Sequence, residues 1–360
     1  MSAINVALVG VGNCACSLVE GVAFHSSPGG LHSTTGVRLP RIGEYEATDL
    51  RFVAAFDVSA NKVGKDLADA IHASPNETIR LAPVPNLGID VLRGPTLDGI
   101  GRTTASVIEE SKESPTDVVD AIRRAKADVV VNYLPVGSDN ATHFYAAAAL
   151  EAGCAFINCM PTSIASSPEW SGRFTAAGLP LIGDDVKSQL GATVLHRALL
   201  RLFRDRGVGL TNSYQLNVGG NADFLNMHEP ERGHAKENSK IRAIGGFSSE
   251  ALGGAPISAS VGYIPGLGDR KSAYIRLDGL VFGAAPIALD VKLDVWDSPN
   301  SAGVVVDAIR YAKIALDNGS CGTLGAASAF LMKSPPEQMD EDDAIRQLQA
   351  ISGLFNDGNI

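Results

Sequence analysis

Lysine and aspartate side chains recur in the second half of the sequence in short clusters that could bind an anion. The segment 183–188 (GDDVKS) combines two carboxylates, an ammonium and a hydroxyl in one turn. Lys236 and Lys240 are four residues apart, which places them on one face of a helix. Lys271 ends the segment GDRK, and Lys333 follows an apolar helical stretch. Two like charges on one helix face are mildly unfavourable unless an anion neutralises them, so these lysines are candidates for binding an anionic ligand.

Several of these residues also have simpler explanations. Ser188 could cap the helix predicted to follow it, and the same helix N-terminus could hold a phosphate. On spacing alone, a solvated surface helix explains Lys236 and Lys240 better than a binding site does. His228 and His234 lack a specific metal-ligand spacing, and no G-x-S-x-G motif supports a hydrolase. Capping does not explain the two carboxylates and the lysine of the GDDVKS turn, which therefore stays a candidate site.

A glycine-rich turn near the N-terminus predicts a dinucleotide site. Gly10-x-Gly12-x-x-Ala15 lies between a buried strand and a helix. Gly10 permits the tight turn, Gly12 lets the backbone approach a pyrophosphate, and Ala15 allows close helix–strand packing. Asp57 ends the next strand, where its carboxylate could bind ribose hydroxyls and favour NAD over NADP. The Gly- and Pro-rich insertion 26–49 accounts for the unusually long sequence distance between the glycines and Asp57. The alternative to a dinucleotide site is a glycine turn in a doubly wound fold that binds no nucleotide.

Further cofactor contacts are predicted at the ends of strands. Asn13 belongs to the glycine-rich turn, and Asn132 and Tyr133 follow a buried strand. The carboxyl ends of parallel strands near a switch point line the ligand crevice. We therefore predict Asn13, Asn132 and Tyr133 at the cofactor site, with ordinary turn chemistry as an equal explanation for the last two.

The first two hundred residues alternate between strands and helices, which predicts a parallel, doubly wound sheet. Short apolar runs rich in β-branched residues predict the strands, at 4–9, 51–57, 127–134, 154–159 and 180–183. Helical patterns fall between or after them, at 14–24, 61–71, 115–125, 139–152 and 188–206.

The strand pattern changes after Gly207, which predicts a second, mixed or antiparallel sheet. The longer segments 208–218, 255–264, 271–282 and 285–296 show partial alternation of apolar and polar residues. Helices are predicted at 302–316 and 324–332, and the acidic tail is predicted to end in a surface helix. The predicted fold class is therefore α/β, with a Rossmann-type N-terminal domain and an α+β second domain.

Composition and net charge limit the classes of partner and the compartment that we expect for this protein. At 360 residues the chain is long enough for two domains, and its net charge of −10 disfavours nucleic acid and anionic membranes. Five scattered cysteines argue against a disulfide-built secreted fold. Neither a signal peptide nor an apolar run of membrane-spanning length is recognisable. We predict a cytoplasmic protein.

An ordered set of motifs resembles inositol-phosphate synthases, in the compact form found in bacteria. These enzymes cyclise glucose 6-phosphate. The resemblance covers nearly the whole chain and rests on VGVGNCA, GDDVKSQ, NVGGNADFLN, KENSK, GDRK, VWDSPNSAG and FLMKSPPEQ, in that order. The asparagine-rich turn of the family is only partly kept at 217–223.

The resemblance implies a redox-neutral reaction. Bound NAD would oxidise C5 of the open-chain sugar, and the new ketone would acidify the C6 protons. Enolisation, aldol attack on C1 and return of the hydride would give 1D-myo-inositol 3-phosphate, also named L-myo-inositol 1-phosphate. This is the first step of inositol and inositol-phospholipid biosynthesis.

The resemblance also assigns roles to residues. Lys236, Lys271, Lys333 and Asp185 would be catalytic, with Lys236 also near the cofactor. Lys240 and Ser188 would hold the substrate phosphate, and Ser188 would contact the cofactor as well. Asp185 and Asp223 would orient the nicotinamide and the lysines. Asp297 would bind a divalent cation, Zn or Mg.

The family architecture implies a domain division and an assembly. Residues 1–195 and 306–360 would form the dinucleotide-binding domain, and 196–305 the catalytic and oligomerisation domain of a homotetramer. Two other functions remain open. A conventional NAD-dependent dehydrogenase of a phosphorylated or acidic substrate would use the same fold but accumulate NADH. A non-catalytic NAD sensor would not need the clustered lysines.

Overall fold

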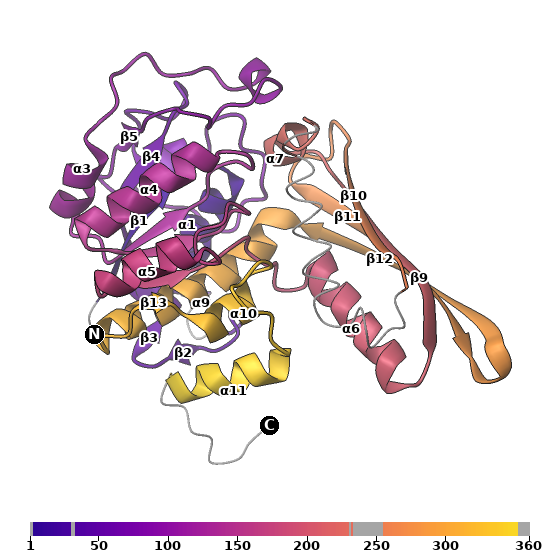
Figure 1. The fold of residues 1–360 in the computed structure, drawn as a ribbon. Helices are drawn as coiled ribbons and strands as arrows, with labels where there is room; N and C mark the ends of the chain where they lie inside the picture. Colours follow the sequence, from indigo (N-terminus) through magenta and orange to yellow (C-terminus); the bar gives the residue numbers. More distant parts are fainter. Residues whose placement is uncertain (1–2, 30–32, 230–231, 233–254, 352–360) are drawn as a thin grey trace.

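The computed structural model describes residues 3–29, 33–229, 232 and 255–351. Two layered parts are visible in Figure 1: an α/β part that carries the N-terminus, and a twisted second sheet that extends away from it. The chain enters the second part through helix α6 (Ala192–Asp205) and returns to the first through helix α9 (Asp297–Asp317). The division predicted from the sequence, at 195/196 and 305/306, stays a prediction.

The described strands of the first part form a parallel sheet of seven, in the order β13-β8-β7-β6-β1-β4-β5. Their bounds are Ile4–Val9 for β1, Leu50–Asp57 for β4, Val91–Arg93 for β5, Val129–Asn132 for β6, Ala155–Asn158 for β7, Pro180–Ile182 for β8 and Gly322–Thr323 for β13. The first strand pairs with β4 on one side and β6 on the other, so the chain changes direction across the sheet at β1. This switch point places a crevice at the carboxyl end of β1.

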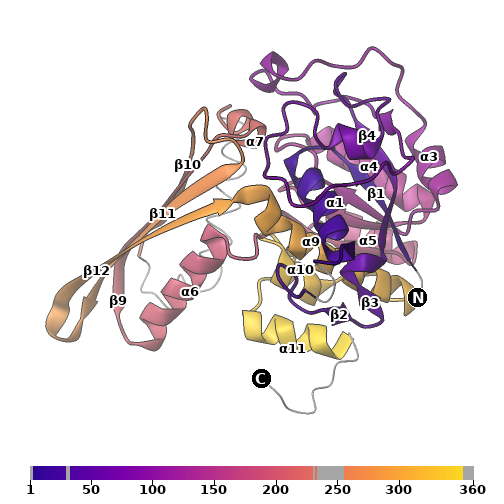
Figure 2. The ribbon, with the colours of Figure 1, turned by 180° about the vertical axis from the view of Figure 1, so that it is seen from behind.

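Both faces of this sheet are buried, which explains the unbroken apolar runs of its strands. Val6 and Leu8 of β1 face one core, while Ala7 and Val9 face the other. Helices α1 (Asn13–Ser26), α9 and α10 (Gly325–Leu331) cover the first face. Helices α3 (Val118–Ala125), α4 (Asp139–Ala152) and α5 (Pro168–Ala176) cover the second. Figure 2, seen from the side opposite to Figure 1, shows α1 and α9 side by side on the near face of the sheet.

The second sheet, as described, has four strands in the order β10-β9-β11-β12. Their bounds are Gly209–Gly219 for β9, Ile257–Tyr263 for β10, Arg270–Val281 for β11 and Ala285–Trp296 for β12. β10 is parallel to β9, and β11 is antiparallel to both β9 and β12. Helix α6 covers one face, where Leu200 and Phe203 pack on Ile275 and Leu277. The predicted α/β class with a second, mixed sheet is confirmed.

Three predicted helices begin later than expected. The helix predicted at 188–206 begins at Ala192, and Gly191 is its N-cap residue, so Ser188 does not cap it. The helix predicted at 61–71 is only α2 (Leu67–Ala70), because Asp66 accepts the Ala68 N–H group and starts the helix there. The helix predicted from 115 begins after Asp117, which accepts the Asp120 N–H group. In the last two cases a side-chain cap sets the start.

Two further expectations need correction. The helix predicted at 302–316 is longer, since α9 begins at Asp297. The insertion at 26–49, expected at the surface, contains a short hairpin of β2 (Arg41–Ile42) and β3 (Tyr45–Glu46), followed by the 3-10 turn Ala47–Asp49. Ile42 is fully buried because this hairpin packs against α9, whose Arg310 side chain donates to the Leu39 carbonyl at 3.0 Å.

The acidic tail forms α11 (Glu341–Ile351), as predicted. No helix in the described ranges is long and apolar enough to cross a membrane.

Candidate functional site

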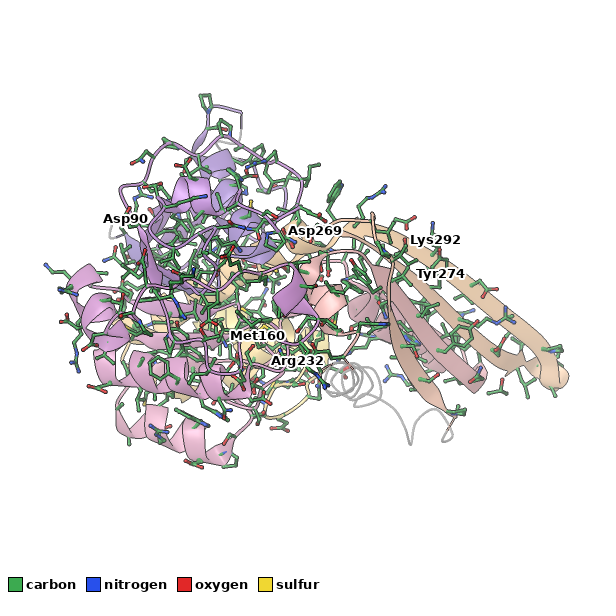
Figure 3. All side chains as sticks on the ribbon, turned by 90° about the horizontal axis from the view of Figure 1, so that it is seen from above. Asp90, Met160, Arg232, Asp269, Tyr274 and Lys292 are labelled. Carbon is green, nitrogen blue, oxygen red and sulfur yellow. The ribbon has the colours of Figure 1, made fainter. Side chains whose placement is uncertain are left out.

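A cavity of about 260 Å³ lies between the carboxyl edge of the parallel sheet and the second sheet. Figure 3 shows Asp269 where the two parts of the molecule meet, with Tyr274 and Lys292 farther out along the second sheet. Most of the described residues predicted for the site line this cavity, namely Gly10, Gly12, Asn13, Asp57, Tyr133, Ser188, Asp223, Lys271, Asp297 and Lys333. Lys236 and Lys240 lie outside the described residues.

The glycine-rich turn leaves open space at the start of α1. Gly10 has φ of +87°, and a Cβ atom there would lie 2.7 Å from the Tyr133 carbonyl oxygen. Only glycine is compatible with this close approach. By contrast, a Cβ atom at Gly12 would meet no atom of the described residues within 4 Å. Gly12 is the N-cap residue of α1, so the first N–H groups of the helix face the cavity without a side-chain cap.

Asp57 lies beside this turn although 46 residues separate it from Val11. Its Oδ2 atom accepts the Val11 N–H group at 2.8 Å, and its Oδ1 atom accepts the N–H groups of Val58 and Ser59 at 2.7 and 2.9 Å. Lys62, a residue that the sequence analysis did not single out, holds its ammonium 3.8 Å from the same carboxylate. The predicted proximity of glycines and aspartate is therefore present in the fold.

Asn132 and Tyr133 are placed differently from each other. The Asn132 side chain is buried behind the cavity and donates to Asn158 Oδ1 at 2.9 Å and to Thr142 Oγ1 at 3.2 Å. Asn132 does not line the cavity. Its side chain stabilises the turn after the strand, which is the alternative explanation that the sequence analysis gave for this residue. Tyr133 does line the cavity, and its buried hydroxyl has no hydrogen-bond partner among the described residues.

Lys333 and Asp185 form an ion pair, with Nζ 3.0 Å from Oδ1. Asp185 is fully buried and has φ of +62°, an uncommon conformation for a residue with a side chain. Backbone hydrogen bonds hold it there: Asp185 N–H donates to the Met160 carbonyl at 2.8 Å, and Lys333 N–H donates to the Asp185 carbonyl at 2.6 Å. A bridge between Val186 and Met332 continues this pairing.

Lys187 is the cation of the GDDVKS turn, and the sequence analysis assigned it no individual role. Its side chain is buried, and Nζ donates to the carbonyl oxygens of Ala329 at 2.5 Å and Phe330 at 3.2 Å, at the end of α10. Burial, followed by the charge of the nearby Arg197, lowers the pKa of this ammonium to about 7. Lys187 thereby fixes the end of the helix that precedes Lys333.

Asp184, the other carboxylate of the turn, organises the loop after β7. Its oxygens accept the N–H groups of Ile164, Ala165 and Ser166 at 3.0 to 3.1 Å, and the Asn158 amide at 2.7 Å. Burial raises the pKa of this carboxyl to about 6, while the hydrogen bonds act in the opposite direction. Asp184 therefore has a structural role at the site, and this role could be identified only from the three-dimensional structure.

The second cation of the cavity is Lys271, at the start of β11. It forms an ion pair with Asp297, the first residue of α9. Behind this pair, the fully buried Asp269 accepts the Asn221 amide at 2.8 Å and the Ser298 hydroxyl at 2.8 Å. Burial, followed by the charge of Asp297, raises the pKa of Asp269. Lys271 and Lys333 thus bring ammonium groups to the cavity in addition to Lys62, and each of the three lies beside a carboxylate.

Ser188 and Asp223 complete the predicted set. Ser188 lines the cavity in the turn before α6, not at a helix N-terminus. Asp223 lies in the first turn of α7 (Ala222–Asn226), and the Asn221 side chain caps this helix by accepting the Asp223 and Phe224 N–H groups at 3.0 and 3.1 Å. Asn221 is therefore a positioning residue that links α7 to Asp269.

A doubly wound sheet with an open glycine turn, and a second sheet that brings Lys271 to the cavity that Lys333 also lines, define a Rossmann-type two-part enzyme. Residues 191–298 match the family described as myo-inositol-1-phosphate synthase. The inositol-3-phosphate synthase of Corynebacterium glutamicum is 51% identical over 97% of this chain and 98% of its own length. That of Mycobacterium tuberculosis is 53% identical over 96% and 95%. The chain belongs to the myo-inositol-1-phosphate synthase family.

Solved structures agree with this assignment. The crystal structure of Ari2 has a TM-score of 0.80 and 38% identity, and the match covers 98% of this chain and 100% of that one. A myo-inositol-1-phosphate synthase-related protein from Thermotoga maritima also has a TM-score of 0.80, at 26% identity, over 98% and 99% of the two chains.

Proposed function

We propose that this chain cyclises glucose 6-phosphate to 1D-myo-inositol 3-phosphate, with NAD as a cofactor that is regenerated in each turnover. One observation carries the proposal: Lys271 and Lys333, each paired with a carboxylate, line the same cavity as the glycine-rich turn. The full-length relatives named inositol-3-phosphate synthase support it. The reaction would take place in the cytoplasm, as the first step of inositol biosynthesis.

The residues present fit a dinucleotide. The space at Gly12 allows close approach of a pyrophosphate, and the uncapped start of α1 offers N–H groups to its oxygens. Asp57 lines the cavity where a ribose would lie, and the Tyr133 hydroxyl, which has no partner within the described part of the chain, suits a polar ligand beside it. Reversible hydride transfer at C5 of the open-chain sugar is the chemistry that the dinucleotide supplies when bound.

In this proposal the lysines handle the charge that develops on the sugar. The ammonium groups of Lys271 and Lys333 stabilise the enolate formed when a C6 proton leaves, and the alkoxide formed at C1 during ring closure. Asp185 and Asp297 keep these ammonium groups in place, since each accepts from one of them. Ser188, with Lys240, holds the phosphate. Lys236 is catalytic and contacts the cofactor.

Asp223 is proposed to orient the nicotinamide and the lysines from the first turn of α7.

The described residues around Asp297 fit a divalent cation, Zn or Mg, less well than the residues of the glycine-rich turn fit a dinucleotide. Its carboxylate is already paired with Lys271, and the neighbouring Asp269 carboxylate accepts from Asn221 and Ser298. A protein site for such a cation needs several free oxygen or nitrogen ligands. We therefore assign no step to a cation there.

A homotetramer is proposed from the uncovered face of the second sheet. Tyr214, Leu216 and Tyr274 lie on one face, because Tyr274 pairs with Leu216 and Arg276 with Tyr214 in the β9–β11 register. All three apolar or aromatic side chains are exposed. Such a surface marks an interface between protein chains. We expect Leu216→Glu to reduce the mass measured by analytical ultracentrifugation; an unchanged tetramer would locate the interface elsewhere, and a monomeric wild type would contradict the assembly.

The test of the reaction is incubation of the purified protein with NAD and glucose 6-phosphate, with inositol phosphate and NADH measured together. Inositol phosphate without net NADH is the expected result. NADH that accumulates in step with an oxidised sugar phosphate would identify a conventional dehydrogenase instead. If the protein still binds NAD but forms neither product, the proposed substrate is wrong.

A further inference from the structure

A thiol, an imidazole and a carboxylate meet beside α1, and none of the three residues lines the cavity described above. Cys16 and Glu20 are four residues apart on this helix, which places them on one face. His72, just after α2, lies across from both. Its Nδ1 atom is 3.7 Å from Cys16 Sγ, and its Nε2 atom is 3.4 Å from Glu20 Oε1.

The cluster is buried but reaches the surface through the histidine. Cys16 and Glu20 are almost completely buried, whereas the His72 side chain is 25% exposed. His72 and Glu20 line an open surface cavity together with Arg80, Leu81, Ala82 and Pro83. The Arg80 guanidinium lies 3.4 Å from Glu20, but its side chain is 60% exposed and can withdraw into solvent. An ion would have a path to the cluster.

These are the ligand types that zinc prefers, and their spacing is close to what it needs. One ligand atom from each residue lies within 4.8 Å of the other two. Tetrahedral zinc, with bonds of about 2.0–2.3 Å, separates its ligand atoms by roughly 3.4–3.7 Å. The side chains would need to move together slightly to reach this spacing, with one imidazole nitrogen turned toward the cation.

We propose that Cys16, Glu20 and His72 form a structural binding site for a thiophilic divalent cation of the zinc class. A solvent molecule completes the coordination from the surface cavity. A catalytic Cys-His pair does not explain the cluster, because burial raises the pKa of the Cys16 thiol to about 12 and keeps it a poor nucleophile. A dication bound between Cys16 and Glu20 would instead displace the thiol proton to solvent, and its charge would compensate the thiolate and the carboxylate.

The site would tie the segment after α2 to the start of α1. Glu20 Oε2 already accepts the Leu81 N–H group at 2.6 Å. Between His72 and Leu81, the Asn76 side chain donates to the Val11 carbonyl at 3.0 Å, and Glu77 N–H donates to Asn13 Oδ1 at 2.8 Å. A bound cation would hold this segment against the glycine-rich turn and would stabilise the folded protein.

The experiment is a titration of the chelator-treated full-length protein with Co²⁺, which reports thiolate coordination as a near-ultraviolet charge-transfer band. We expect the band to saturate at one equivalent and Zn²⁺ to displace it. Cys16→Ser should abolish the band. His72→Ala should weaken Co²⁺ binding at least about 100-fold, because the loss of a residue that only hydrogen-bonds to a metal ligand already lowers metal affinity about 10- to 100-fold. His72 is partly exposed, so this variant should fold.

Cys14→Ser is the matched control, because Cys14 lies on the cavity side of the same helix, near Ser298. It should keep the band. A band that disappears in Cys14→Ser but persists in Cys16→Ser would place the cation at the catalytic cavity and overturn the proposal. The absence of any thiolate band would overturn it as well. An increase of the unfolding temperature by Zn²⁺ in wild type, but not in His72→Ala, gives an independent readout.

Discussion

The ammonium of Lys333 lies 3.0 Å from the carboxylate of Asp185, although 148 residues separate the two in the sequence. Backbone hydrogen bonds between the turn after β8 and the segment after α10 hold the pair together. Lys187, from the same turn, binds the last carbonyls of α10. The backbone contacts around Lys333 therefore fix the segment that carries its flexible side chain, and with it the position of the ammonium group.

Lys333→Met should reduce kcat/KM for glucose 6-phosphate at least about 100-fold, because it removes a positive charge from the site where negative charge develops. It also takes the ammonium partner from the buried Asp185, so the free energy of unfolding should fall. Adding Asp185→Asn should restore part of the stability without restoring turnover. Steady-state kinetics and urea unfolding measure both effects.

The control for this lysine is Lys112→Met, at an exposed position outside the cavity. It should leave turnover and stability nearly unchanged. Near-normal turnover in Lys333→Met would show that Lys333 is not a catalytic residue.

Gly10→Ala and Gly12→Ala should separate folding from cofactor binding. At Gly10 an added Cβ atom would meet the Tyr133 carbonyl oxygen and would force a strained φ, so we expect a loss of about 1–3 kcal/mol in unfolding free energy. At Gly12 the folded chain has room, and φ of −89° suits alanine. Gly12→Ala should therefore keep wild-type stability but bind NAD more weakly, because its methyl group occupies the space for the pyrophosphate.

Thermal unfolding and NAD titration of the two variants check this pair. Equal stability losses would mean that Gly12 is needed for the turn and not for a ligand.

Asp57→Asn should reduce the preference for NAD over NADP. The carboxylate accepts three backbone N–H groups and lines the cavity, where it would repel a 2′-phosphate and bind the ribose hydroxyls. Its loss should weaken NAD binding about 10-fold, as expected for hydrogen bonds to a charged group. Dissociation constants for both dinucleotides measure the change, and Asp90→Asn, at an exposed position marked in Figure 3, is the control. An unchanged ratio of the two constants would remove Asp57 from the ribose site.

The second domain should lose stability in mild acid through His196. Burial lowers the pKa of this imidazole to about 4, between Ser213 and Gln215. Between its unfolded pKa of about 6.5 and its folded pKa, the unfolded chain binds a proton that the folded chain does not, so stability falls as pH falls through this window. From about pH 7 to pH 5 the loss is roughly 2 kcal/mol.

Urea unfolding of wild type and His196→Gln at both pH values isolates this contribution, since other carboxylates titrate equally in the two proteins. The same pH dependence in both proteins would show that His196 stays protonated or exposed in the folded state.

Local patterns allowed much of the fold to be predicted. The apolar runs of β1, β6 and β7 are continuous because both faces of the sheet are buried, and this is visible in the sequence. The bounds of α4 also agree, since it begins after Ser138 and ends at Gly153, which has the positive φ of a helix terminus. The errors fall at helix starts. Asp66 and Asp117 set them through single side-chain hydrogen bonds.

Residue types and their order along the chain were enough to predict a dinucleotide turn, an acidic strand end and a set of lysines, because each of these depends on a short segment. Only the tertiary structure decided which of them meet. Lys333 reaches Asp185 and Lys271 reaches Asp297 because α10 and α9 pack beside the parallel sheet. Asn132 turns away from the cavity because Thr142 and Asn158 lie within hydrogen-bond distance behind it. Such contacts depend on how distant elements pack, and no local spacing encodes them.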